Sequence, residues 1–65
     1  MSYKEAKKLA EKGATITMVI IDSLYNRHEF YYSKDKFPDK NFSEFCAYFW
    51  YHFADNPERS LLKFY

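Results

Sequence analysis

Residues 42–53 read FSEFCAYFWYHF, and seven of these twelve residues carry an aromatic ring. The apolar positions recur at the i, i+3, i+4, i+7 spacing of one helix face: Phe42, Phe45, Cys46, Phe49, Trp50 and Phe53. A second, amphipathic stripe lies beside it: Ala47, Tyr48 and Tyr51. Successive helix positions rotate by about 100°, so rings on both stripes cannot all face one small sheet. We therefore expect a helix over 42–55 with surplus rings that contact another molecule.

The ends of this helix carry local signals. Asn41 or Ser43 can cap its first turn, and Glu44 favours that turn. Asn56 and Pro57 end the helix, because the residue before a proline is biased away from helical geometry.

The segments on either side of the helix predict three strands. Residues 14–22 are rich in β-branched side chains and have the length of one strand. Residues 23–27 supply a turn, in which Asn26 is able to take a left-handed conformation. Residues 28–34 then return, which completes a β-hairpin over 14–34, and residues 59–65 predict the third strand.

The first thirteen residues predict a short helix. Ser2 and Glu5 have capping-box spacing, and Gly13 supplies a stop. The order α-β-β-α-β predicts an α+β fold: a three-stranded antiparallel sheet in the order 2-1-3, with the long helix on one face. The short first helix is expected to shield only part of the opposite face. A second copy of the chain could cover the rest, so we expect a homodimer.

Composition limits the function classes. A chain of 65 residues forms one domain, 1–65, and its 48% hydrophobic content argues against disorder. The net charge of +1 creates no broad field for nucleic acid. The longest apolar run, 18–21, is too short to span a bilayer, and the charged N-terminus lacks a signal sequence. With one cysteine and no export signal, we expect a cytoplasmic protein.

Catalysis is not expected. Cys46 and His52 are six residues apart, which places them on different sides of a helix rather than as a nucleophile and its base. Gly13 is the only glycine, so no glycine-rich phosphate loop exists. No Cys/His array has zinc spacing. We expect neither a metal nor a cofactor.

Single-stranded nucleic-acid binding is an alternative. Phe30, Tyr31 and Tyr32 on one strand resemble a base-stacking platform, with several basic residues nearby. Acidic residues interleave with those cations, so the local charge is close to zero. Packing of these rings in a core or a dimer is the favoured interpretation.

Three stretches carry a family resemblance: TITMVIID in the first strand, EFYYSK in the second, and FSEFCAYF at the helix start. Across roughly residues 15–50 the sequence resembles the small uracil-DNA glycosylase inhibitors of certain Bacillus phages. The resemblance implies a homodimer that occupies the DNA-binding cleft of the host enzyme. It also implies an apolar pocket, shaped by Phe45 and Phe49, that traps the residue at the tip of the enzyme's DNA-probing loop. The family's acidic position between these rings falls on Cys46, and this chain is less acidic than the family.

The sequence thus predicts a phage-type inhibitor that binds host uracil-DNA glycosylase stoichiometrically in the bacterial cytoplasm. The expected contact residues are Phe42, Glu44, Phe45, Cys46, Tyr48, Phe49 and Asp22, with Asp55 as a further acidic contact. An interaction module for another host or defence protein, acting through the same aromatic surface, is the main alternative.

Overall fold

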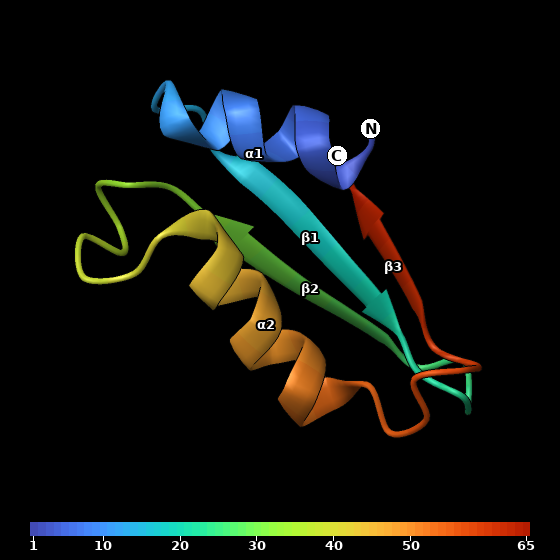
Figure 1. The fold of residues 1–65 in the computed structure, drawn as a ribbon. Helices are drawn as coiled ribbons and strands as arrows, with labels where there is room; N and C mark the ends of the chain where they lie inside the picture. The colour runs from blue at the N-terminus through green and yellow to red at the C-terminus, as the bar shows by residue number, and fades with distance from the viewer.

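The computed structural model describes all residues, 1–65. Two helices and three strands follow one another along the chain in the predicted order (Figure 1). Their bounds are α1 Tyr3–Glu11, β1 Ile16–Ile21, β2 Arg27–Tyr32, α2 Phe42–Phe53 and β3 Leu61–Phe64. None of the helices is long and apolar enough to cross a membrane.

The three strands form one antiparallel sheet in the order β2-β1-β3, which confirms the predicted topology. The hairpin register pairs Ile16 with Tyr32 and Ile21 with Arg27. The residue of the hairpin turn that takes the left-handed conformation is Tyr25 (φ 65°), rather than the Asn26 that the sequence offers for it. The reason is the Asp22 carboxylate, whose Oδ1 accepts the N–H groups of Leu24 and Asn26 at 2.9 Å and fixes the turn around Tyr25.

Helix α1 has the predicted ends. The hydroxyl of Ser2 accepts the N–H of Glu5 at 3.2 Å, while the Glu5 carboxylate accepts the N–H of Ser2 at 3.3 Å. Past the C-terminal end, Gly13 has φ +96°, a conformation that side-chain-bearing residues rarely adopt. Its N–H donates to the Ala10 carbonyl at 3.0 Å, so the chain can leave the helix and enter β1.

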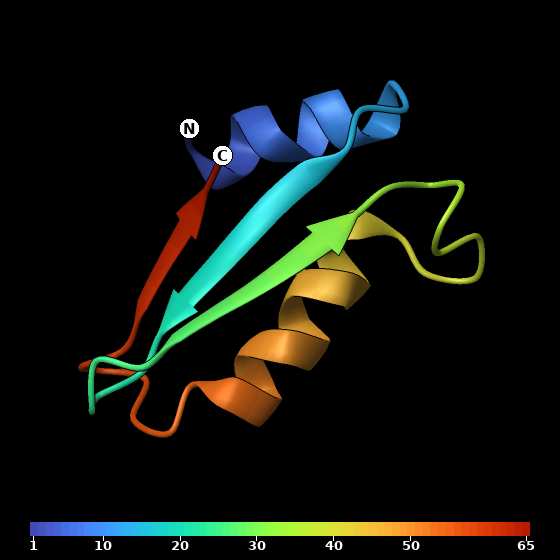
Figure 2. The same cartoon turned by 180° about the vertical axis from the view of Figure 1, so that it is seen from behind.

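Both helices cover the same face of the sheet, so the expectation that α1 shields the opposite face is wrong (Figures 1 and 2). Helix α2 lies along β2, where the Phe49 ring stacks on Phe30 with centroids 4.2 Å apart. That placement leaves room beside β1 and β3 on the same face. Helix α1 fits this space because its inward residues, Ala6 and Ala10, are small and fully buried.

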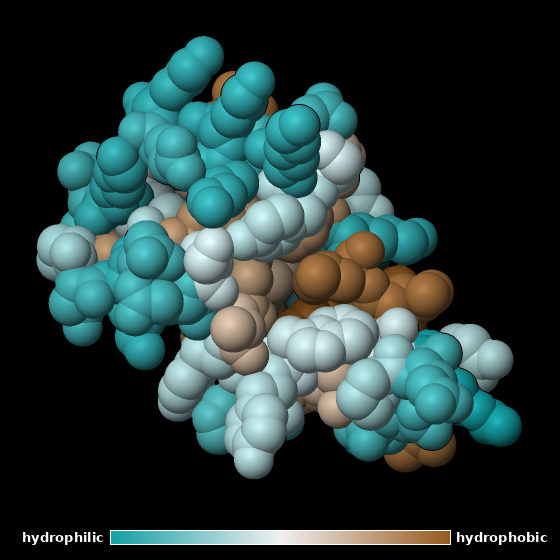
Figure 3. All heavy atoms as spheres, viewed as in Figure 1, coloured by the Kyte–Doolittle hydropathy of each residue, from teal (hydrophilic) through white to brown (hydrophobic).

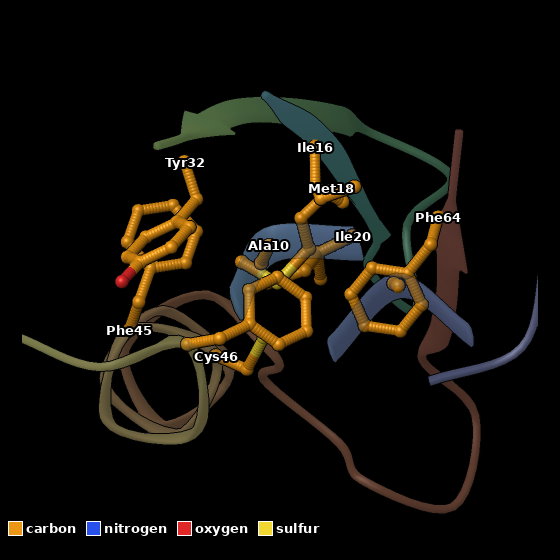
Figure 4. Close-up of a cluster of buried hydrophobic side chains, with 10 residues drawn as sticks. Ala10, Ile16, Met18, Ile20, Tyr32, Phe45, Cys46 and Phe64 are labelled. Atoms are coloured by element: carbon orange, nitrogen blue, oxygen red, sulfur yellow. The ribbon is translucent and has the colours of Figure 1, made fainter. Parts of the chain in front are cut away.

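One cluster of buried side chains joins the helices to this face of the sheet (Figure 4). It is apolar throughout, and strand β1 supplies its centre through Ile16, Met18 and Ile20, each at most 1% exposed. Burial of one large apolar side chain contributes about 1.5–3 kcal/mol, so this cluster is the main source of stability in so short a chain.

Candidate protein-binding surface

The local sequence sets the start and the orientation of α2. Asn41 is the N-cap: its side chain accepts the N–H of Glu44 at 2.8 Å, and the Glu44 carboxylate accepts the N–H of Asn41 at 3.3 Å. The capped helix turns Phe42, Phe45 and Cys46 inward, where they are 3%, 1% and 6% exposed. Three of the predicted contact residues therefore belong to the core.

The burial of Phe45 corrects the predicted pocket. Its ring lies under Tyr32 and Phe37, with centroid distances of 5.0 Å and 5.1 Å, and against Phe49 at 4.9 Å. The hydroxyl of Tyr32 donates to the Lys40 carbonyl at 2.8 Å, which ties the 33–41 loop down over these rings. The Phe45 and Phe49 rings consequently pack directly against each other and leave no space between them for a partner's side chain.

Cys46 is buried beside these rings. Desolvation raises the pKa of its thiol to about 12. A thiol with this pKa is protonated at neutral pH and is therefore a poor nucleophile. Its role in the fold is that of a small apolar side chain.

The three acidic residues proposed for partner contact are used within the chain. Glu44 closes the α2 capping box. Asp22 holds the hairpin turn through Oδ1, and its Oδ2 lies 3.0 Å from Nε2 of His28. The His28 contact, followed by the Asn26 N–H, lowers the pKa of Asp22.

Asp55 also bonds internally. It accepts the N–H of Ser23 at 3.0 Å and the Ser23 hydroxyl, and its Oδ1 accepts the hydroxyl of Ser60 at 3.3 Å. The Ser23 contacts lower its pKa. Asp55 thus joins the end of α2 to the hairpin turn. These engaged carboxylates do not form a row of free negative charges that could imitate a DNA backbone.

Surface rings gather where α2 meets β2, and we call this group the aromatic flank. It consists of Phe30 from β2 and Tyr48, Phe49, His52 and Phe53 from α2. Phe30 contacts Phe53 with centroids 5.0 Å apart, Tyr48 contacts Phe49 at 5.1 Å, and Tyr48 contacts His52 at 4.5 Å. Tyr48 is 48% exposed and Phe53 is 36% exposed, so the flank is an aromatic surface rather than part of the sealed core.

Polar groups border the flank at both ends. Nζ of Lys40 lies 4.5 Å from the centroid of the Tyr48 ring, in cation–π geometry. At the other end the His28 ring lies 5.0 Å from the Phe53 ring. The flank therefore offers aromatic area with polar groups at its rim, which is the usual anatomy of a protein interface.

The sequence predicted Tyr48 and Phe49 as contact residues, and in the structure both lie in the flank. The sequence did not predict Phe30, His52 or Phe53 as contact residues. The i, i+4 spacing of Tyr48 with His52, and of Phe49 with Phe53, was a usable signal. The contribution of Phe30 depends on how α2 lies against β2, which no local pattern encodes.

The proposed base-stacking platform is not assembled. Successive strand residues point to opposite faces, so Phe30 and Tyr32 face the helices while Tyr31 lies on the other side. Tyr32 is only 2% exposed. The three rings therefore present no common surface to successive bases.

A cleft of about 580 Å³ lies between α1 and the 33–41 loop. It is bordered by Lys7, Lys34 and Lys40 together with Glu11 and Asp39. Lys34 uses its ammonium group to donate to the Glu11 carbonyl at 2.7 Å. Mixed charges and a bound lysine give this cleft no clear ligand preference.

On the side of the molecule that carries the helices, the hydropathy of the surface differs between α1 and α2 (Figure 3). Hydrophilic side chains gather over α1, whereas paler and apolar atoms gather toward α2 and β3.

No group of three or more His, Cys, Asp or Glu side chains is placed to hold a metal ion. Comparison of the sequence with protein-family models and curated proteins, and of the fold with solved structures, gave no match.

Proposed function

We propose that this protein is a non-catalytic inhibitor that acts by binding another protein through the aromatic flank. The observation that carries the proposal is the exposure of Tyr48 and Phe53 next to the half-buried Phe30 and Phe49. Contiguous exposed aromatic area is unusual on a monomeric protein and marks interaction sites. Tyr, Trp and Phe are enriched at protein interfaces, and Trp and Tyr are enriched among the few central residues that carry most of the binding energy.

The target that we propose is uracil-DNA glycosylase. The support is the resemblance across residues 15–50, together with a hairpin, helix and final strand in the order that this family has. The mode of contact differs from the one that the resemblance implies, because Phe45 is buried. In our proposal the flank lies against an apolar part of the enzyme's DNA-binding cleft and blocks DNA by occupying that space.

A second target class uses the same surface: another host or defence protein. The engagement of Asp22, Glu44 and Asp55 within the chain favours this class, because a partner selected for binding DNA phosphates would prefer free carboxylates. Both targets require the flank, so an experiment on the flank tests the proposal separately from the identity of the target.

The decisive experiment is a titration of uracil-DNA glycosylase with the purified protein, read as uracil excision from a labelled oligonucleotide. We expect excision to stop near a fixed molar ratio of inhibitor to enzyme. Phe49→Ala should raise the midpoint at least about tenfold, since truncation of a central interface aromatic costs more than about 1.4 kcal/mol. Leu9→Ala, which truncates an exposed apolar residue on α1, is the matched control and should inhibit like the wild type.

Two results would contradict the proposal. Uninhibited excision in the presence of a large excess of folded protein would remove uracil-DNA glycosylase as the target. Equal inhibition by Phe49→Ala and the wild type would remove the flank as the contact surface.

A further inference from the structure

Strand β2 forms an outer edge of the sheet, with β1 on one side and no strand on the other (Figure 2). Thr17 of β1 exchanges backbone hydrogen bonds with Tyr65, on the side away from β2, at 3.1 Å and 2.9 Å. Bonding alternates along an antiparallel strand, so every second residue after Thr17 also bonds away from β2. The β2 residues opposite them, Arg27, Glu29 and Tyr31, therefore direct their N–H and C=O groups outward from the sheet.

These outward backbone groups have no partner within the chain. The side chains of the same residues bond to one another instead: Nε of Arg27 donates to Oε1 of Glu29 at 2.9 Å, and the hydroxyl of Tyr31 donates to Oε2 of Glu29 at 2.8 Å. Both bonds join residues of one strand on the face of the sheet opposite the helices. The edge of β2 therefore keeps a row of unused donors and acceptors.

The β2 edge also lacks the usual protection against pairing. Proteins commonly protect edge strands by short length, proline, lysine or a bulge. Strand β2 has six residues, contains neither proline nor lysine, and pairs with β1 without a bulge. Its Arg27 is neutralised by Glu29, with Nη2 and Oε1 2.8 Å apart. The other edge strand, β3, has only four residues and includes Lys63.

The aromatic flank lies beside this edge. Phe30 belongs to both, because its ring is part of the flank and its backbone lies between the outward groups of Glu29 and Tyr31. The Phe30 ring stacks on Phe49 with centroids 4.2 Å apart and contacts Phe53 at 5.0 Å. A strand added to β2 would lie about 4.8 Å farther out, so its side chains on the helix side would lie next to these rings. A protein that covers the flank therefore also reaches the edge.

We infer that the partner protein supplies an extended segment that pairs with β2 as a fourth, antiparallel strand. This inference rests on the proposed function, because the protein that covers the flank is the source of the segment. Each outward residue of β2 exchanges two backbone hydrogen bonds with the segment, and antiparallel pairing is the more stable geometry. Addition of a strand to an open sheet edge is an established way for proteins to recognise extended peptides.

The two faces of the added strand have different surroundings. Residues that exchange hydrogen bonds across an antiparallel pair carry their side chains on the same face. The segment residues that bond to Glu29 and its outward neighbours therefore lie beside charged and hydroxyl groups, where polar side chains fit. The residues between them turn toward the flank, where apolar side chains fit. We therefore expect a segment of about six residues, matched to β2, in which apolar and polar residues alternate.

A blocked nine-residue peptide, in which Val and Thr alternate between terminal lysines, is the probe for this edge. Amide hydrogen exchange of the ¹⁵N-labelled protein, followed by NMR, reports on each backbone N–H separately. At about 5 mM peptide, exchange at Glu29 and Tyr31 should slow about fivefold, the result for a dissociation constant of about 1 mM. Exchange at His28 and Phe30, which bond to β1, should not change.

Two methylated versions of the peptide test the orientation of the added strand. In the inferred arrangement, the Thr residues direct their N–H groups to β2 and the Val residues direct theirs to solvent. N-methylation of the Thr residues should therefore abolish protection of the β2 amides, whereas N-methylation of the Val residues should preserve it. The reverse result would overturn the antiparallel arrangement.

Glu29→Pro tests the edge from the side of the protein. It removes an outward N–H without removing a bond to β1, and edge strands tolerate proline at such positions. The variant should lose peptide binding, while Glu29→Ala, which keeps the N–H, should bind like the wild type. Leu62→Pro is the matched control, because it removes an outward N–H from the β3 edge. Circular dichroism verifies each fold, and the exchange measurement on the wild type does not depend on these variants.

Unchanged exchange at the outward amides would overturn the inference, as would equal peptide binding by folded Glu29→Pro and the wild type. Protection that rises with the concentration of the protein alone would also overturn it, because a second copy would then occupy the edge. Inhibition of uracil-DNA glycosylase tests the proposed function separately. Peptide binding without inhibition would remove that target and leave the edge, whereas equal inhibition by Glu29→Pro and the wild type would remove the edge and leave the function.

Discussion

The two helices pack on the same face of one sheet, but α1 does so with small side chains and α2 with large aromatic ones. Helix α1 inserts Ala6 and Ala10, which are fully buried, and its outer side is hydrophilic. Helix α2 inserts Phe42 and Phe45, which are nearly as well buried, but further rings of the same helix reach the surface, with Tyr48 48% exposed. A helix that docks through alanines completes its packing inside the chain. Helix α2 has more rings than the sheet can cover, so part of its aromatic area stays on the surface, and we propose that this area binds a partner.

The largest expected effect is on the ring that α2 buries most completely. Phe45→Ala should lower the free energy of unfolding by about 3–5 kcal/mol, because it leaves a cavity among Tyr32, Phe37 and Phe49. A chain of this size has little more stability than that, so the variant should be largely unfolded. Urea denaturation followed by circular dichroism measures the loss.

Tyr51→Ala is the control on the same helix. Tyr51 is 82% exposed, and its removal should change the free energy of unfolding by no more than about 0.5 kcal/mol. A loss below about 1 kcal/mol for Phe45→Ala would contradict the division of α2 into a buried and a surface side.

Where α1 packs through alanines, a larger side chain rather than a smaller one should lower the stability. Ala6→Leu adds volume where the helix meets the core, and overpacking of this kind costs about 1–3 kcal/mol. Thermal unfolding should show a lower midpoint for this variant, while Leu9→Ala on the exposed side should stay close to the wild type. An unchanged midpoint for Ala6→Leu would mean that α1 does not pack closely on the sheet.

The smallest effect concerns the hairpin turn, which links β1 to β2. The bond to His28 and the N–H of Asn26 lower the pKa of Asp22 in the folded chain. A lowered pKa means that this contribution to stability is present above the unfolded pKa of about 3.9 and is lost as the pH falls through the folded pKa. When the pH is lowered from about 5 through the folded pKa of Asp22, the thermal midpoint of Asp22→Asn should therefore fall less than that of the wild type. Thermal unfolding of both proteins at a series of pH values measures this difference. Parallel curves for the two proteins would show that the Asp22 carboxylate does not stabilise the turn.

Local patterns were enough to predict the elements and their order. The β-branched run at 14–22 and the spacing of Ser2 with Glu5 act within a few residues. The strand formed within the first pattern, at Ile16–Ile21, and the helix formed directly after Ser2, at Tyr3–Glu11. The antiparallel order β2-β1-β3 also followed, because a helix between two strands limits how the chain can return.

The surface depends on contacts that no local pattern contains. Phe37 lies in a loop without periodicity, yet its ring covers Phe45 and removes the predicted pocket. The face of the sheet on which α1 packs depends on the space that α2 leaves beside β1. The division of rings between core and flank was therefore decided by tertiary packing rather than by helical spacing.

The most direct test of the central claim measures Tyr48→Ala in two ways on one preparation: its free energy of unfolding, and its inhibition of uracil-DNA glycosylase. If the surface rings of α2 serve binding rather than folding, the unfolding free energy should change by less than about 1 kcal/mol. The inhibition midpoint should rise at least about tenfold. Unchanged inhibition by this folded variant would contradict the claim, as would a loss of stability as large as that expected for Phe45→Ala.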